Sequence, residues 1–163
     1  MLEFIEHRTM QGMQITCTSV STTDADTLVA IRIAAMRESL ERIGRFDPHR
    51  ARERFLAGFD PASTRFIELD GVRVGFVVLK NAASSLLLDH LYVVPSHQGR
   101  GIGAAVLAQV FAQADASART VRVGALRGSD SNRFYRRHGF VLVEEGEFDN
   151  YYERAAVAAQ GSR

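Results

Sequence analysis

Apolar residues between positions 24 and 61 recur at intervals of three and four, the spacing of one face of a helix. A loosely alternating stretch, residues 13–20, precedes them and predicts a short strand. The helical stripe consists of Val29, Ile33, Met36, Leu40 and Ile43. Gly44 is expected to end this helix. Asp47-Pro48 then starts a second helix, with Phe55, Leu56 and Phe59 expected to face inward.

From residue 64 onward the hydrophobic period changes to two. Residues 64–69 and 72–79 flank Asp70-Gly71, a dipeptide typical of a two-residue hairpin turn. Residues 85–94 carry apolar side chains on both faces, which predicts a central strand. The remaining predicted elements are a helix over 101–116, a strand over 121–125, a helix over 129–138, and strands over 140–143 and 148–154. Hairpins combined with crossovers predict an α/β fold with a mixed sheet flanked by helices.

The composition is that of one globular domain. The chain has 163 residues, 46% hydrophobic and 24% charged, enough for one core. We expect residues 13–154 to form this domain, residues 1–12 to be a poorly ordered extension and residues 155–163 to be a tail. No apolar run approaches the roughly 18 residues of a membrane helix, and Glu3 and Glu6 interrupt any signal peptide. The expected protein is cytoplasmic, without a membrane partner.

Charge and cysteine content exclude further classes. Twenty basic and nineteen acidic residues give a net charge of +1, so no field is present that would hold a nucleic-acid backbone. Cys17 is the only cysteine, which excludes an internal disulfide and a cysteine-based zinc site. We expect no metal, and we interpret Cys17 as a small apolar filler rather than a nucleophile.

The turn between the strand at 85–94 and the helix at 101–116 carries the clearest chemical signal. Glycines at 99, 101 and 103 remove side chains that would keep a large anion from the backbone. The N–H groups of the first helical turn point at such an anion, and the helix dipole favours its charge. Arg100 can add a charge-assisted hydrogen bond. The sequence therefore predicts a phosphate or pyrophosphate at residues 98–103.

Other glycine-rich phosphate motifs fit this turn less well. A Walker A loop needs Gly-Lys-Ser/Thr, and the only lysine is the distant Lys80. A dinucleotide fingerprint needs a third glycine where this chain has Ala104, and it belongs after an early strand. A glycine turn that serves only tight strand-to-helix packing remains an alternative reading of the same residues.

Three segments together resemble the GNAT superfamily of N-acetyltransferases. The run from Gln98 to Gly103, Gln-Gly-Arg-Gly-Ile-Gly, resembles the family's acetyl-CoA pyrophosphate loop, Q/R-x-x-G-x-G/A. The preceding Leu91–Pro95 looks like its fourth strand, and Asn132–Phe140 resembles its second signature. Residues 13–154 follow the family's element order. The resemblance implies a three-layer fold whose central mixed, mainly antiparallel sheet splays between strands four and five and is flanked by helices.

The same resemblance implies acetyl-CoA as the co-substrate and acetyl transfer to a primary amine of a small molecule or peptide. Tyr135 matches the family's tyrosine near the thioester sulfur, where a phenol can protonate the departing thiolate. Gly128 stands where the family often has a cofactor-binding asparagine, and Ser129, Ser131 or Asn132 is expected to replace that contact. The implied cofactor-binding residues are Leu91, Tyr92, Val93, Gln98, Gly99, Arg100, Gly101, Ile102, Gly103, Asn132 and Tyr135.

The general base is left open between two neighbours. Asp89 fits the carboxylate that many family members place on the fourth strand, and His90 is the rival on the opposite face. In some members water alone relays the proton. The expected substrate-binding residues are Arg37, Phe46 and Tyr151. A homodimer is a family habit, and an acyl-CoA sensor of the same fold without turnover is the alternative function.

Overall fold

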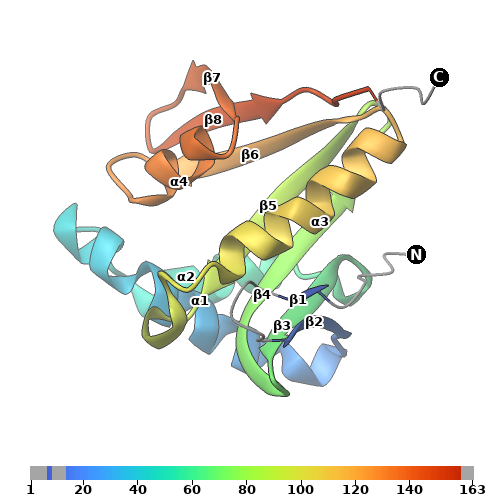
Figure 1. The fold of residues 1–163 in the computed structure, drawn as a ribbon. Coiled ribbons are helices and arrows are strands. Elements are labelled where there is room, and N and C mark those ends of the chain that lie inside the picture. The colour runs from blue at the N-terminus through green and yellow to red at the C-terminus, as the bar shows by residue number, and fades with distance from the viewer. Residues whose placement is uncertain (1–6, 9–13, 159–163) are drawn as a thin grey trace. The chain divides into compact units, whose positions relative to one another are not determined.

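The computed structural model describes residues 7–8 and 14–158, which form a mixed α/β fold (Figure 1). The strands are β1 His7–Arg8, β2 Gln14–Ser19, β3 Thr64–Leu69, β4 Val72–Asn81, β5 Ser85–Val93, β6 Thr120–Leu126, β7 Val141–Glu145 and β8 Asp149–Arg154. The α-helices are α1 Ala25–Arg42, α2 Pro48–Ala57, α3 Ile102–Ala116 and α4 Ser131–Arg137. Three 3₁₀ turns, Thr22–Asp24, Pro61–Ser63 and Pro95–His97, precede α1, β3 and the turn to α3.

Every predicted helix and strand is present, within a few residues of its expected bounds. The predicted extension over residues 1–12 lies outside the described residues except for His7 and Arg8, whose backbone pairs with β2. The chain divides into two compact units. The first unit contains the chain up to Val78 together with His90–Ala105, and the second contains Leu79–Asp89 and the chain from Val106 onward.

In the first unit, β1, β2, β3 and β4 follow one another as antiparallel neighbours. The hairpin predicted at Asp70-Gly71 is confirmed, because both residues have positive φ angles, 49° and 83°, as a type I′ turn requires. Pairing of β3 with β4 shifts register between Ile67 and Glu68. Such an irregularity bends a strand and re-aims its neighbours.

The core of the first unit lies between this sheet and the helices α1 and α2. Its buried residues are Leu28, Val29, Ile31, Phe55, Phe66, Phe76 and Val78. Asp47 caps α2 by accepting a hydrogen bond from the N–H of Arg50 at 3.1 Å, and Gly44 ends α1 with a φ of 68°, as predicted.

The inward faces of these helices were predicted only in part. The stripe on α1 was expected to continue to Ile43, yet Ile43 is 41% exposed, and the buried residues Leu28 and Ile31 lie outside the predicted set. Leu56 on α2 was expected to face inward and is 38% exposed. Periodicity marks a helix face, but the extent of the surface that covers it depends on the other elements.

The second unit contains the parallel part of the fold. Ser85–Leu88 of β5 pair in parallel with Thr120–Val123 of β6, and β8 inserts between β6 and β7, antiparallel to both. Figure 1 shows β6, β8 and β7 in this order, with the short helix α4 beside β6. In α3, Val106, Leu107, Val110 and Ala114 are buried.

An ion pair ties the end of β8 to α3. Arg154 donates two hydrogen bonds to the carboxylate of Asp115, at 2.7 and 3.2 Å, and its guanidinium lies 4.0 Å from the centroid of the Phe111 ring. The N–H of Val157 adds a third hydrogen bond to Asp115. The Arg154 hydrogen bonds, and then that of Val157, lower the pKa of Asp115 below its usual value.

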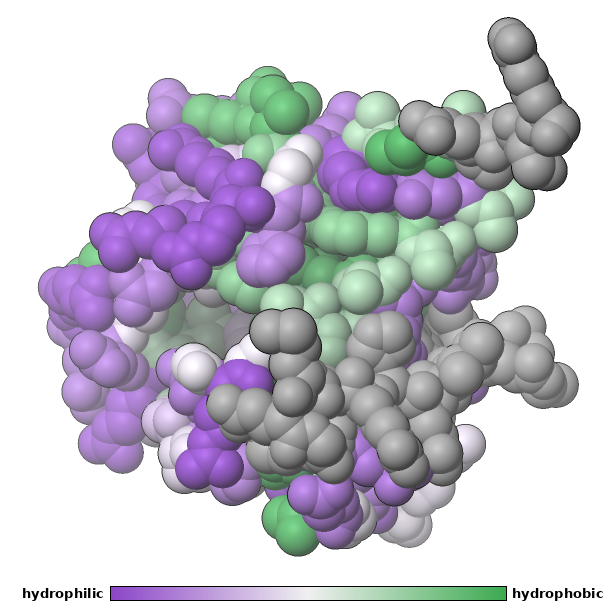
Figure 2. Space-filling model, in the orientation of Figure 1, coloured by the Kyte–Doolittle hydropathy of each residue, from purple (hydrophilic) through white to green (hydrophobic). Residues whose placement is uncertain are grey.

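The strand β7 ends the strand order of the second unit and carries exposed apolar side chains. Val141 is 66% exposed and Val143 is 51% exposed, and Figure 2 shows a hydrophobic area over β7 at the top of the view. Glu144 and Glu145 follow on the same strand, and charges of this kind disfavour pairing with another strand edge. Within the described residues, no helix combines the length and hydrophobicity needed to cross a membrane.

Candidate functional site

The turn from β5 to α3 belongs entirely to the first unit. Strand β5 ends at Val93, and the 3₁₀ turn Pro95–His97 leads to the exposed residues 98–101. None of the described residues accepts a hydrogen bond from the backbone N–H of Gly99, Arg100 or Gly101. The N–H of Ala105 bonds to the carbonyl of Gly101 at 3.0 Å, so α3 begins there. The first helical N–H groups add to this set of donors, which makes the turn suited to an anion.

Two of the three glycines are required by the backbone conformation. Gly99 and Gly101 have φ angles of 75° and 82°, which L-residues with a side chain rarely adopt. A Cβ built on either glycine would meet nothing within 4 Å. Crowding within the protein is therefore not what selects glycine here. The left-handed backbone selects it, and the space beside the turn is open.

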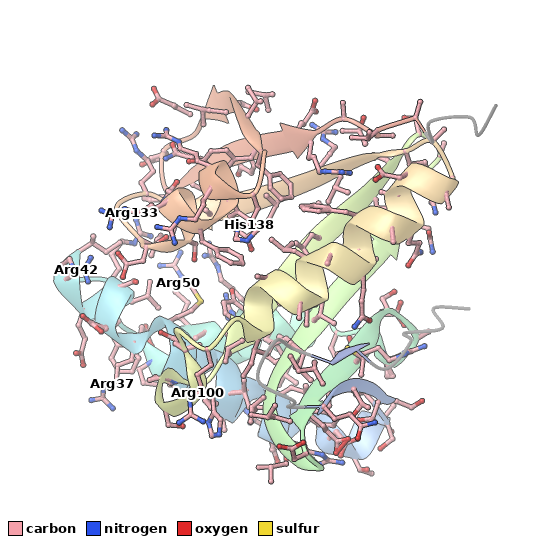
Figure 3. All side chains as sticks on the ribbon, in the orientation of Figure 1. Arg37, Arg42, Arg50, Arg100, Arg133 and His138 are labelled. Atoms are coloured by element: carbon pink, nitrogen blue, oxygen red, sulfur yellow. The ribbon has the colours of Figure 1, made fainter. Side chains whose placement is uncertain are left out.

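Gln98 fixes the turn to the strand before it. Its side-chain amide donates a hydrogen bond to the carbonyl of Val93 at 2.8 Å. This bond connects the end of β5 with the start of the glycine-rich turn. Arg100 is exposed beside the same turn, and Figure 3 shows its side chain among those near the start of α3.

The sequence analysis missed Gly75 of β4, which lies against the backbone at the end of β5. A Cβ placed on Gly75 of β4 would lie 2.1 Å from the carbonyl oxygen of Tyr92 and 3.2 Å from the Cα of Val93. The next residue, Val94, donates its N–H to the carbonyl of Val74 at 2.8 Å. Only glycine admits this approach of two backbones. A glycine inside an otherwise β-branched and aromatic strand is the signal that could have revealed it.

His90 and Tyr92 lie in an aromatic cluster of the first unit. The His90 ring is 5.8 Å from that of Phe55, 6.1 Å from that of Phe76 and 5.5 Å from that of Tyr92. Its Nδ1 is 3.4 Å from the Tyr92 hydroxyl. The imidazole of His90 is therefore half-buried, with aromatic rings on several sides and a phenol hydroxyl next to it.

Asp89, the other candidate base, is engaged in an ion pair. Its carboxylate lies 3.2 Å from the Lys80 ammonium, and both side chains are about one-third exposed, at 36% and 34%. Asp89 belongs to the second unit and His90 to the first. The two candidates therefore differ in their surroundings: a cation faces Asp89, and aromatic rings surround His90.

Tyr135 is a buried residue of α4 in the second unit. It is 5% exposed; its ring contacts that of Phe140 edge-on at 5.2 Å and that of Phe134 at 5.4 Å. Its carbonyl accepts the N–H groups of His138 and Phe140, both at 3.1 Å, and these bonds close the helix before Gly139. The aromatic contacts hold the phenol ring in a defined orientation.

Asn132, predicted to bind the cofactor, uses its side chain within the second unit. Its Nδ2 donates to the carbonyls of Leu126 and Ser129, and its Oδ1 accepts from Asn150 and Tyr152. The cofactor contact of Asn132 remains a prediction.

Of the three predicted substrate residues, two lie together. The Arg37 guanidinium is 4.8 Å from the centroid of the Phe46 ring, and it also pairs with Glu41 at 2.9 Å. Figure 3 shows Arg37 on α1. Tyr151 belongs to the second unit, where it is 41% exposed on β8.

Cys17 lies on β2, and burial raises its pKa to about 12, against a smaller opposing effect of Arg65. A thiol of that pKa is almost entirely protonated at neutral pH and is a poor nucleophile. The interpretation of Cys17 as a packing residue agrees with this environment.

Comparison with known proteins gives one family match and many similar folds. Residues 61–142 match the family described as acetyltransferase (GNAT) domain. The PaiA N-acetyltransferase of Thermoplasma acidophilum, in complex with coenzyme A, is 19% identical with a TM-score of 0.66, over 86% of this chain and 98% of that one. An acetyltransferase of Thermus thermophilus is 21% identical with a TM-score of 0.68, over 86% of this chain and 96% of that one.

The ribosomal-protein-S18-alanine N-acetyltransferase of Escherichia coli is 15% identical with a TM-score of 0.67, over 91% of this chain and 99% of that one. No curated protein matches the chain by sequence. These structural likenesses, at identities this low, concern the fold, whereas the family match covers half of the chain's length.

Proposed function

The chain belongs to the GNAT acetyltransferase family, and from that premise we propose that it transfers an acetyl group from acetyl-CoA to a primary amine of a small molecule or peptide. The observation that carries the proposal is the exposed turn at Gly99–Gly101, whose N–H groups have no acceptor among the described residues. Donors of this kind at a helix N-terminus bind phosphate groups. A family member structure in complex with coenzyme A supports the choice of ligand.

Two segments of the first unit would hold the co-substrate. The backbone of Gln98–Gly103 would bind the pyrophosphate, and Arg100 would add a charge-assisted hydrogen bond from its exposed position. The backbone of Leu91, Tyr92 and Val93 would pair with the amides of the pantetheine arm, as an added strand pairs with a sheet edge. The hydrogen bond from the Gln98 side chain to the Val93 carbonyl would keep these two segments in a fixed relative position.

The reaction needs one base and one acid from the chain. Acetyl-CoA supplies the thioester whose C–S bond breaks as the amine nitrogen bonds to the acetyl carbon. We assign the base to His90, because an imidazole titrates near neutral pH and because Lys80 pairs with the carboxylate of Asp89. Tyr135 would give its phenolic proton to the CoA thiolate.

The test measures binding and turnover side by side. Calorimetric titration with acetyl-CoA is expected to give micromolar binding. A thiol-release assay over a panel of polyamines, amino acids, aminoglycosides and peptides is expected to show turnover with at least one amine. Binding without thiol release on any of these amines would favour an acyl-CoA sensor, and absence of binding would refute the proposal.

Substitution tests the two assigned groups. Tyr135→Phe is expected to lower kcat by about 100-fold, with the dissociation constant of coenzyme A within twofold of wild type. Arg133→Ala, which changes an exposed side chain of the same helix, is the control and should keep kcat within a few-fold. For the base, His90→Gln should remove the rise of kcat/KM between about pH 6 and 8. If Asp89→Asn removes it instead, the assignment passes to Asp89.

A further inference from the structure

The amide of Asn132 is the centre of a hydrogen-bond network within the second unit. Its Nδ2 donates to the Leu126 carbonyl at 2.8 Å and to the Ser129 carbonyl at 3.0 Å. Its Oδ1 accepts from the Tyr152 hydroxyl at 2.7 Å and from Asn150 Nδ2 at 3.0 Å. A primary amide has two N–H donors and one oxygen with two lone pairs. Both donors and both acceptor positions of Asn132 are therefore in use.

The network joins three elements at the start of α4. Leu126 is the last residue of β6, Ser129 lies in the turn before α4, and Asn150 and Tyr152 lie on β8. Tyr152 is 1% exposed, so its hydroxyl has little access to water in place of Asn132. Ser129 also bonds to the carbonyl of Leu126, at 2.7 Å.

Helix α4 begins at this network and is too short to be stable by itself. Helix α4 has seven residues, fewer than two turns, and isolated helices of that length are unstable in water. Its N-cap residue, Asp130, makes no side-chain capping bond. The orientation of α4 is thus set by tertiary contacts. Asn132 precedes Tyr135 by three positions, which places both on the same side of the helix.

We propose that Asn132 is a positioning residue for Tyr135 and does not bind the cofactor through its side chain. By bonding β6, the preceding turn and β8 at once, it fixes the direction of α4 and with it the phenol of Tyr135. This inference rests on the proposed role of Tyr135 as the acid. A cofactor contact of the Asn132 side chain would require one of the present hydrogen bonds to break.

The first test separates positioning from cofactor binding. Asn132→Ala is expected to leave the coenzyme A dissociation constant within twofold of wild type, whereas a weakening of fivefold or more would overturn the proposal. The protein has four tyrosines, so ¹³Cζ-labelled tyrosine spectra can be assigned with Tyr135→Phe. The Tyr135 signal should shift or broaden in Asn132→Ala. It should stay in place in Arg133→Ala, which changes an exposed neighbour labelled in Figure 3.

A double-mutant cycle tests whether Asn132 acts through Tyr135. In the wild-type background, Asn132→Ala should lower kcat 10-fold or more with the KM for acetyl-CoA little changed. In the Tyr135→Phe background the same substitution should lower kcat less than twofold further, because the group that it positions is gone. Full additivity of the two losses would overturn the inference. Full activity of the single variant Tyr135→Phe would refute the acid role of Tyr135, and this outcome is distinguishable from a failure of the positioning role of Asn132.

A milder variant covers the case in which Asn132→Ala does not fold. Tyr152→Phe removes only one hydrogen bond to the Asn132 oxygen and keeps the buried ring. It should lower kcat about threefold to tenfold, with the coenzyme A dissociation constant unchanged, and this loss should also vanish in the Tyr135→Phe background. An unchanged kcat in Tyr152→Phe, together with an unmoved Tyr135 signal, would refute the proposal that this network positions Tyr135.

Discussion

Replacing Gly75 with alanine tests whether the close approach of β4 and β5 shapes the strand that we propose to bind the cofactor. The added Cβ would lie 2.1 Å from the Tyr92 carbonyl oxygen and 3.1 Å from the carbonyl carbon. Ordinary contact begins at 3.4 Å, so the oxygen has to retreat by about 1.3 Å. Both sides of the contact are backbone, and no side-chain rotation can relieve it.

The destabilisation by Gly75→Ala can be worked out from the backbone that has to move. Val94 donates its N–H to the Val74 carbonyl at 2.8 Å, and a retreat of this size would take that bond beyond about 3.2 Å. Loss of the bond costs about 1 kcal/mol, and overpacking costs about 1–3 kcal/mol. The expected destabilisation is about 2–4 kcal/mol, a fall in Tm of roughly 5–15 °C for a domain of this size.

The displaced residues are those proposed to bind pantetheine, so function should change along with stability. We expect Gly75→Ala to weaken coenzyme A at least 10-fold in calorimetric titration at a temperature where the variant is folded. Gly58→Ala is the matched control, since a Cβ at Gly58 meets nothing within 4 Å, and its effect should stay within about 0.5 kcal/mol. A Gly75→Ala protein with the Tm and coenzyme A affinity of the Gly58→Ala control would refute this reasoning.

Three further experiments test the turn, the acid stability and the cysteine. Gly101→Val should weaken coenzyme A at least 10-fold by calorimetry, whereas Gly71→Val, at a nearly equal φ of 83° against 82°, should strain the hairpin between β3 and β4 and leave that affinity within twofold. Asp115 has a lowered pKa in the folded state, so the stability that its ionised carboxylate contributes is fully present above the unfolded pKa of about 3.9 and is lost as pH falls through the folded pKa. Asp115→Asn should therefore lower the free energy of unfolding by about 0.5–1 kcal/mol at pH 7, and below about pH 4 this free energy should fall less steeply with pH than in wild type. Urea titrations that give the same pH dependence for both proteins would contradict this. Cys17, with a pKa of about 12, should react with iodoacetamide at pH 8 at least 100-fold more slowly than in the urea-unfolded protein, and comparable rates would show that the strand opens readily.

Local sequence was enough to determine the order and type of the elements. Asp70-Gly71 predicts a tight hairpin because only a few residue types accept two successive positive φ angles, and both angles are positive in the structure. Gly44 ends α1 for the same reason. The glycines at 99 and 101 indicate an exposed turn, and residues 98–101 are exposed; among the residues that the structure describes, none accepts a hydrogen bond from the N–H groups of these two glycines. Such signals depend on the conformational limits of single residues, so a sequence carries them directly.

Contacts between distant residues decided the rest. Ile43 and Leu56 have the periodicity of buried residues, yet they are exposed, because burial requires a surface from another element and a helical period does not say where that surface ends. Gly75 faces the Tyr92 carbonyl only because β4 and β5 approach there. In the sequence, Asn132 is only one polar residue of the second signature. Its hydrogen bond with Tyr152 exists because the fold places β8 beside the start of α4. Hydrogen bonds and close approaches across the fold are set by three-dimensional geometry, and sequence spacing contains no measure of those distances.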